Sequence, residues 1–156
     1  MGNKTLTIIK PLAFKRGHTG LIIDHIIKAG FAIKAMKLIH LSKEQAERFY
    51  AVHKDKPFFQ DLVDFMSAGS IVAMILEKEN AVSEYRALMG ATNPKNAEPG
   101  TLRNLFGCSM QCNAVHGSDS DENAEIECNF FFSTMEQVEA LQNEQHSLEK
   151  YLACEG

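Results

Sequence analysis

The chain has 156 residues, of which 45% are hydrophobic and 23% charged, and its formal net charge is −4. This length and composition are typical of one soluble globular domain with a real core. The negative charge argues against a sequence-independent nucleic-acid binder, although a local basic pocket stays compatible with it. No apolar run is long enough to span a bilayer. We therefore expect neither a membrane nor a specific nucleic acid among its partners.

The N-terminal residues lead straight into a strand-like segment and lack the charged-then-apolar pattern of a signal peptide. We therefore expect a cytoplasmic location and read the cysteines as reduced thiols. The four cysteines are Cys108, Cys112, Cys128 and Cys154.

The first third of the chain predicts a strand, a helix and a second strand. Residues 4–10 alternate polar and apolar side chains and are rich in Thr and Ile, which is typical of a strand. Thr19 is a candidate N-cap for a helix that stops before Gly30. Residues 31–41 predict the second strand.

The middle of the chain predicts three helices and a buried strand. Ser42 and Gln45 have the spacing of a capping box at the start of the first helix. Residues 58–66 and 81–89 predict the other two. Between these two helices, residues 71–76 form a continuous apolar run, which indicates a strand covered on both faces.

After this, periodicity disappears over residues 91–111. We interpret this segment as a long binding loop, because it carries Thr92 and Arg103 and because long loops in compact domains are usually functional. A short strand over 114–116 and a helix over 121–132 are expected next.

The last segment predicts a further helix, capped by Thr134 and Gln137. Apolar residues at helical spacing give that helix one stripe, which could cover this subunit or an interface. The stripe consists of Val138, Leu141, Leu148 and Leu152.

Taken together, the order of elements is the β-α-β-β-α-β pattern of a ferredoxin-like α+β fold, an antiparallel sheet with helices packed on it. We expect a single domain over 1–156. Its core spans about 4–133, and a C-terminal helical extension spans about 134–156.

The stretch from Asn113 to Ser120 places His116 on a strand-like step, just before a turn rich in Gly, Ser and Asp. A neutral imidazole can act as a nucleophile when a carboxylate holds its other ring nitrogen as N–H. Several acidic residues follow within reach of that role. The alternative is a turn histidine that only bonds the backbone, and the spacing alone leaves both open. The acidic residues are Asp119, Asp121, Glu122, Glu125 and Glu127.

A second alternative is a zinc site formed by Cys108, Cys112 and His116, which are spaced by four. Structural zinc sites usually need a second matching pair of ligands, and the sequence contains none.

Motifs elsewhere in the chain help to decide between a nucleophilic histidine and these two alternatives. They are Lys10-Pro11 after the first strand, Lys56-Pro57-Phe58-Phe59, Gly90-Ala91-Thr92-Asn93-Pro94, Pro99-Gly100-Thr101-Leu102-Arg103 and the His-Gly-Ser-Asp element at 116–119. In this order they resemble the nucleoside diphosphate kinase family, from about Lys4 to Phe132. The resemblance implies the ferredoxin-like fold. It also implies transfer of the γ-phosphoryl group of a nucleoside triphosphate, mainly ATP, to nucleoside diphosphates by a ping-pong mechanism through a phosphohistidine.

The resemblance also assigns roles to residues. His116 is the nucleophile, Glu127 orients it, and Ser118 lies close to it. Tyr50 is an active-site position, or alternatively a core aromatic. The expected nucleotide-binding residues are Lys10, which also serves catalysis, and Phe58, Arg86, Thr92, Arg103, Met110 and Asn113.

Within this set, Phe58 stacks on the base and Met110 covers its other side, which implies broad base specificity. Mg²⁺ arrives on the nucleotide phosphates, with Asp119 as an outer-sphere partner. A homotetramer or homohexamer built from dimers is expected.

The chain departs from the family pattern at three places. Leu12-Ala13 replaces Asp-Gly, Gln111-Cys112 replaces Gly-Arg, and Ser70 replaces Pro. The change at 111–112 predicts an altered lower rim of the pocket without loss of activity. A non-catalytic oligomeric scaffold is the other alternative, and the presence of Lys10, His116 and Arg103 counts against it.

Overall fold

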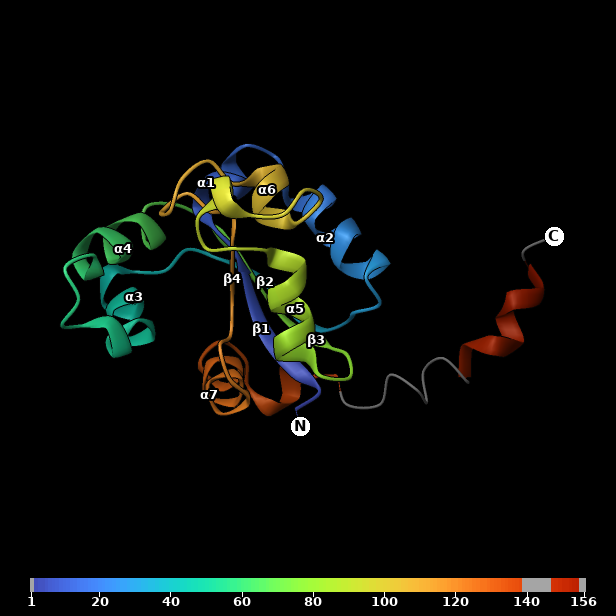
Figure 1. Ribbon diagram of the computed structural model, residues 1–156. Helices are drawn as coiled ribbons and strands as arrows, with labels where there is room; N and C mark the ends of the chain where they lie inside the picture. Colours follow the sequence, from blue (N-terminus) through green and yellow to red (C-terminus); the bar gives the residue numbers. More distant parts are fainter. Residues whose placement is uncertain (1, 139–146, 155–156) are drawn as a thin grey trace.

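The computed structural model describes residues 2–138 and 147–154. Its centre is an antiparallel sheet in the order β2-β3-β1-β4 (Figure 1). The four strands are β1 (Lys4–Ile9), β2 (Ala32–Ile39), β3 (Ile71–Glu77) and β4 (Val115–Gly117). The expected ferredoxin-like α+β fold is confirmed.

Helices cover both faces of the sheet, and the alternation of side chains along β3 explains why. Ile71, Ala73 and Ile75 belong to one core cluster. Val72 and Met74 belong to a second cluster. Because successive strand residues point to opposite faces, β3 is buried on both sides, as its apolar run predicts.

The first cluster lies under α3 (Lys43–Phe49), α4 (Phe59–Met66) and α7 (Asp121–Phe131). The second lies under α2 (Thr19–Lys28), α5 (Ala81–Met89) and α6 (Leu102–Phe106).

Two predicted caps have different outcomes. The capping box of α3 is confirmed, because Ser42 and Gln45 exchange both side-chain hydrogen bonds. Thr19 as an N-cap is wrong by one residue. His18 occupies that position with a helical backbone, and its carbonyl accepts the first intrahelical bond from Ile22.

The segment 91–111 is only partly a loop. It contains a 3-10 helix over Pro94–Asn96 and the helix α6. Thr101 caps α6 by accepting a hydrogen bond from the Asn104 amide at 3.4 Å. These turns are shorter than the window over which helical periodicity becomes visible. The short helix α1 (Pro11–Lys15), which begins with Pro at N1, was missed for the same reason.

The expected C-terminal cap is also wrong. Ser133 and Glu136 form the capping box, and the turn is a 3-10 helix over Thr134–Glu136 that ends before Gln137. A further 3-10 helix spans Glu149–Cys154.

The apolar stripe of that segment is described only in part. Leu141 lies outside the described residues, while Val138, Leu148 and Leu152 are exposed. In the part of the chain that is described, no helix is both long enough and apolar enough to cross a membrane.

Candidate functional site

His116 lies on β4, a three-residue strand at the edge of the sheet. It pairs with Ile8 in the register of β1 and β4. Its carbonyl accepts a hydrogen bond from the Thr7 hydroxyl at 2.8 Å, and Thr7 is bonded in turn to the Tyr85 hydroxyl at 2.6 Å. The backbone of His116 is therefore fixed from a buried strand and from α5.

A tight turn precedes β4. Ala114 has a φ of 71°, and the Val115 amide donates to the Asn113 carbonyl at 2.9 Å across it, which is a γ-turn. A non-glycine residue in this region carries backbone strain, which tends to be stored at functional sites. The predicted strand over 114–116 is corrected by one residue, because Ala114 belongs to the turn.

The His116 ring has one nitrogen engaged. Its Nε2 is bonded to a carboxylate oxygen of Glu127, which lies on α7. A carboxylate only accepts, so Nε2 carries a proton, and in the neutral ring Nδ1 then has the lone pair. The structure thus brings together the predicted nucleophile and its predicted orienting residue.

Aromatic rings enclose this histidine. The centroids of Phe49 and Tyr50 lie 5.3 and 6.1 Å from that of His116, both edge-on. The Tyr50 hydroxyl is buried and has no hydrogen-bond partner among the described residues. Burial, with the charge of Glu127, raises the pKa of Tyr50 far above its usual range, so the hydroxyl stays a donor. Tyr50 therefore lies both in the core and beside His116.

Lys10 and Asn113 form a buried polar pair. The Lys10 ammonium donates to Asn113 Oδ1 at 2.6 Å, and Asn113 Nδ2 donates to the Thr92 carbonyl at 3.1 Å. Burial, with the nearby charge of Arg103, lowers the pKa of Lys10 to about 7. An anion at this point would restore the charged form.

Arg103 ties the segment around α6 to the strand that carries His116. Its guanidinium donates to the Gly90 carbonyl at 3.1 Å and to the Val115 carbonyl at 3.0 Å. Its Nε is buried and has no partner within the described chain. Burial lowers the pKa of Arg103, and the charge of Arg86 acts in the same direction.

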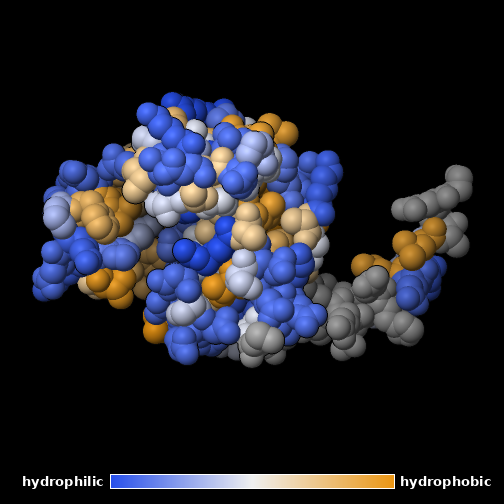
Figure 2. All heavy atoms as spheres, in the orientation of Figure 1, coloured by the Kyte–Doolittle hydropathy of each residue, from blue (hydrophilic) through white to orange (hydrophobic). Residues whose placement is uncertain are grey.

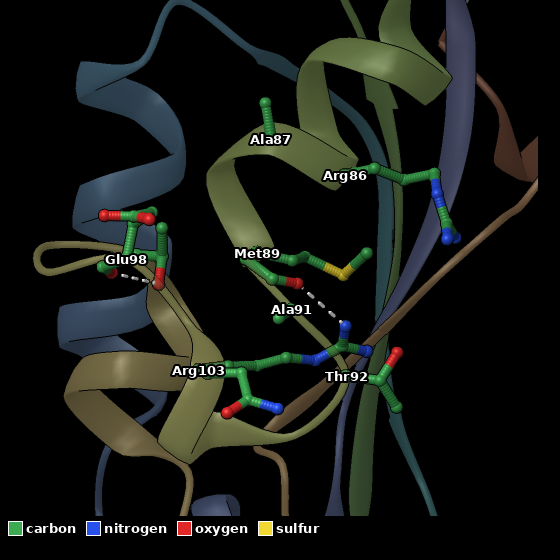
Figure 3. Close-up of a pocket in the computed structure, with 10 residues that line it drawn as sticks. Arg86, Ala87, Met89, Ala91, Thr92, Glu98 and Arg103 are labelled. Atoms are coloured by element: carbon green, nitrogen blue, oxygen red, sulfur yellow. Dashed lines mark hydrogen bonds between the residues drawn. The ribbon is translucent and has the colours of Figure 1, made fainter.

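A cavity of about 390 Å³ lies beside Arg103, Arg86 and Thr92. Figure 3 shows the guanidinium of Arg103 pointing toward Thr92, with Arg86 reaching down from α5 and Glu98 at the other side. In the orientation of Figure 1, strongly hydrophilic side chains lie in a hollow near the centre of the molecule (Figure 2). Two arginines and a hydroxyl around one cavity suit an anion with several oxygens.

The two predicted base contacts lie at the surface. Phe58 and Met110 are both about half exposed. Phe59, the next residue, packs against the first core cluster. Gln111 donates to the Asp61 carbonyl at 3.0 Å, so the segment that carries Met110 is tied to α4.

Two residues near the site were missed. The His53 ring lies 5.5 Å from the Phe58 ring, and Phe49 contacts His116 as described above. Phe49 and Tyr50 are adjacent aromatic residues, and the sequence pattern does not distinguish an aromatic ring in the core from one at the site. Tyr50 and His53 are three residues apart, which indicates a shared face.

Ser118 and Asp119 are already engaged. Ser118 is fully buried, and both its amide and its hydroxyl bond the backbone of Leu6 at 3.2 Å. Asp119 Oδ1 accepts from Asn123 Nδ2 at 2.6 Å. The expected roles of Ser118 and Asp119 stay predictions.

The cysteine segment does not form the suspected zinc site with His116. Within residues 2–138 and 147–154, no group of three or more His, Cys, Asp or Glu is close enough to hold a metal ion. His116 is directed instead to Glu127.

Comparison with known protein families matches residues 3–137 to the family described as Nucleoside diphosphate kinase. A Nucleoside diphosphate kinase from Chlamydia abortus is 58% identical over 135 residues, covering 86% of this chain and 96% of that protein. One from Persephonella marina is 54% identical over 136 residues, covering 87% and 97%.

Solved structures agree with these relatives. The nucleoside diphosphate kinase of Aquifex aeolicus superposes with a TM-score of 0.86 at 44% identity, covering 87% of this chain and 99% of that one. That of Halobacterium salinarum, in complex with CDP, gives 0.87 at 33% identity, covering 95% and 99%.

Proposed function

We propose that this chain, which belongs to the nucleoside diphosphate kinase family, passes the γ-phosphoryl group of a nucleoside triphosphate to a nucleoside diphosphate through a phosphohistidine on His116. Phosphoryl transfer between nucleotides is the activity of the family. The histidine intermediate, the ping-pong order and ATP as the main donor are the parts that we propose. The observation that carries the proposal is the hydrogen bond between His116 Nε2 and Glu127, because in the neutral ring it leaves the lone pair on Nδ1.

In the first half-reaction, the lone pair on Nδ1 attacks the γ-phosphorus. The N–P bond forms while the bond from that phosphorus to the β,γ-bridging oxygen breaks, and the diphosphate leaves with that electron pair. The proton on Nε2 stays against Glu127, whose negative charge stabilises the positive charge that develops on the ring. In the second half-reaction, the terminal oxygen of an acceptor diphosphate attacks the same phosphorus and releases Nδ1.

The buried cations prepare the pocket for phosphate charge. Lys10 lies buried beside Arg103, so the bound phosphates supply the negative charge that this pair lacks. Arg103 is held by two carbonyl groups and keeps a buried Nε–H without a partner in the described chain. We assign Arg86 and Thr92 to the same phosphates, because they line the cavity beside Arg103.

Tyr50 supplies a second unused donor. Its hydroxyl is buried near His116 and lacks a partner among the described residues. We infer that it donates to an oxygen of the transferred phosphoryl group.

Magnesium fits this site as an ion carried by the nucleotide. Around the cavity the described chain offers cations and a hydroxyl instead of a cage of carboxylates. Such a site suits an ion that keeps several waters and binds the phosphates themselves. Asp119 would contact one of those waters, and the bound ion would neutralise charge on the nucleotide phosphates.

The base end supports broad specificity. Stacking on Phe58 is available to every base, and Met110 adapts to rings of different shape. The Halobacterium salinarum relative holds CDP. We therefore propose that purine and pyrimidine diphosphates are both accepted, and that ATP is the main donor.

We further propose a homotetramer or homohexamer built from dimers, located in the cytoplasm. Met36 and Leu38 support an assembly, because both are exposed apolar residues on β2, an edge strand of the sheet. Light scattering on the purified protein would give the mass of the assembly, and a monomer at micromolar concentration would reject this part.

The mechanism is tested by intact mass after brief mixing with magnesium ATP and rapid removal of nucleotide. We expect one acid-labile phosphoryl group that is discharged by any nucleoside diphosphate. It should be absent from His116→Ala and present in His40→Ala, a matched control whose ring bonds the Ser67 carbonyl. No adduct on the wild-type protein under conditions where ATP binds would reject the phosphohistidine.

A further inference from the structure

Two cysteines that the proposed reaction does not use lie in the turn between α6 and β4. The Cys108 amide donates to the Cys112 carbonyl at 2.7 Å, and the Cys112 amide donates to the Ser109 hydroxyl at 3.0 Å. The two thiols are also joined by a side-chain hydrogen bond, which the Cys112 thiol donates to the Cys108 sulfur. The turn therefore holds the two sulfurs next to each other, as disulfide formation requires.

The two thiols have different environments. Cys108 is exposed, whereas Cys112 is partly buried. A hydrogen bond from the Cys112 thiol, with help from the Arg16 guanidinium, lowers the pKa of Cys108. Burial raises the pKa of Cys112 to about 11. Arg16 Nη1 lies 4.0 Å from Cys112 Sγ, so a positive charge sits beside the pair. Exposure and a neighbouring cation are the features that make a cysteine reactive.

We propose that Cys108 and Cys112 form a reversible disulfide in response to hydroperoxides, with Cys108 as the attacking thiolate and Cys112 as the resolving thiol. The Cys108 thiolate attacks the terminal peroxide oxygen, the O–O bond breaks, and hydroxide leaves from hydrogen peroxide or an alkoxide from an organic hydroperoxide, so that Cys108 becomes a sulfenic acid. Cys112 Sγ then attacks Cys108 Sγ, the S–O bond breaks, and water leaves with the Cys112 proton. The two cysteines lose two electrons, and the peroxide gains them.

The disulfide would act on the nucleotide site that we propose, and this consequence rests on that proposal. Cys112 precedes Asn113, which holds the Lys10 ammonium, and Met110 lies inside the five-residue ring that the bond would close. Drawing the two sulfurs together moves the backbone beside Asn113. Because small misplacements of positioning groups cost up to about a hundredfold in rate, we expect the nucleotide KM to rise on the order of tenfold on oxidation.

The modification itself is tested without any activity measurement, on the full chain carrying Cys154→Ser. Brief treatment with hydrogen peroxide should remove two hydrogens from the intact mass, and dithiothreitol should restore them. Peptide mapping should locate the bond between residues 108 and 112. With Cys112→Ser added, a sulfenic acid on Cys108 should persist and react with dimedone. With Cys108→Ser added, neither product should form.

Two matched controls sharpen the test. Cys128→Ala should leave disulfide formation unchanged, since Cys128 is buried. Arg16→Gln should slow the peroxide reaction several-fold while the reduced protein keeps its nucleotide KM. A dimedone adduct on Cys112, or oxidation of wild-type Cys108 to sulfinic acid without loss of two hydrogens, would overturn the proposal. The intact mass reports disulfide formation directly, so this test still gives an answer if the phosphohistidine mechanism is wrong.

Discussion

The candidate site has a proposed phosphate end, formed by Lys10 and Arg103, and a proposed base end, formed by Phe58 and Met110. The two ends differ in how firmly the chain holds their side chains. At the phosphate end, Lys10 is 7% and Arg103 is 8% exposed, and both donate hydrogen bonds to fixed groups. At the base end, Phe58 is 49% and Met110 is 58% exposed. Under the proposed function, the buried and hydrogen-bonded side chains lie where charge develops during the reaction, and the exposed side chains meet the base, which varies between substrates.

The largest expected effect comes from Arg103→Ala. Loss of a preorganised donor to the phosphates should lower kcat/KM by about 10²–10³-fold. The carbonyls of Gly90 and Val115 would also lose their partner, which costs about 1–3 kcal/mol in unfolding free energy for each group left unsatisfied. Arg86→Ala is the matched control, because Arg86 is exposed and should affect activity alone. Equal melting temperatures for the two variants would contradict this difference.

A second effect is the pH dependence of stability from Lys10. Its folded pKa of about 7 lies below the ordinary 10.5, so between these values the unfolded chain binds the proton and the native chain does not. Stability of the nucleotide-free protein should therefore rise with pH across this window, by at most about 1.4 kcal/mol per pH unit.

Urea unfolding at pH 7, 8 and 9 would measure this slope. In Lys10→Met the contribution should vanish. If the unfolding free energy of the wild type rises no more steeply with pH than that of Lys10→Met, water reaches Lys10 in the native protein.

The third prediction concerns Phe58→Ala at the base end. Loss of stacking is worth about 1–3 kcal/mol, and it should appear as a higher KM, by a similar factor for purine and pyrimidine diphosphates. Phe59→Ala is the control, since Phe59 packs against the core and should lower stability while KM stays unchanged. A loss confined to one base would reject permissive stacking.

The smallest effect is expected from Met110→Ala. Met110 is 58% exposed, and contacts at the exposed rim of a binding site usually contribute little when truncated, so the KM should change by about twofold or less. Steady-state kinetics with two diphosphates would check this. A loss as large as that of Phe58→Ala would mean that both faces of the base are held, and the contrast between the two ends would then fail.

The sheet and its covering helices could be predicted because their signals are long. The continuous apolar run at 71–76 indicates a strand covered on both faces, and the helix at 81–89 is long enough for its buried residues to recur at helical spacing. The turns could not be predicted in this way. The positive φ of Ala114 is set by tertiary contacts on Asn113 and Val115, and alanine itself has no preference for that conformation.

The candidate site could likewise be predicted only in part. The family resemblance implied one site that includes Lys10, Arg103, Asn113 and His116. In the structure, Lys10 bonds Asn113, and Arg103 bonds the carbonyl of Val115, the residue before His116. The partners of their remaining groups could not be read from the chain. Arg103 donates to two backbone carbonyls, and the Ser118 hydroxyl accepts from the Leu6 amide. These hydrogen bonds depend on distances that only the folded sheet sets.

The hydrogen bond between Lys10 and Asn113 joins residues 103 positions apart in the chain. During synthesis, Lys10 leaves the ribosome long before its partner exists, and the edge strand that carries His116 comes later still, with Glu127 after it. The nascent chain can thus form the first strands and helices while the proposed site is still incomplete. A fragment that ends before Asn113 carries Lys10 and Arg103 but not His116 or Glu127, so we expect it to transfer no phosphoryl group.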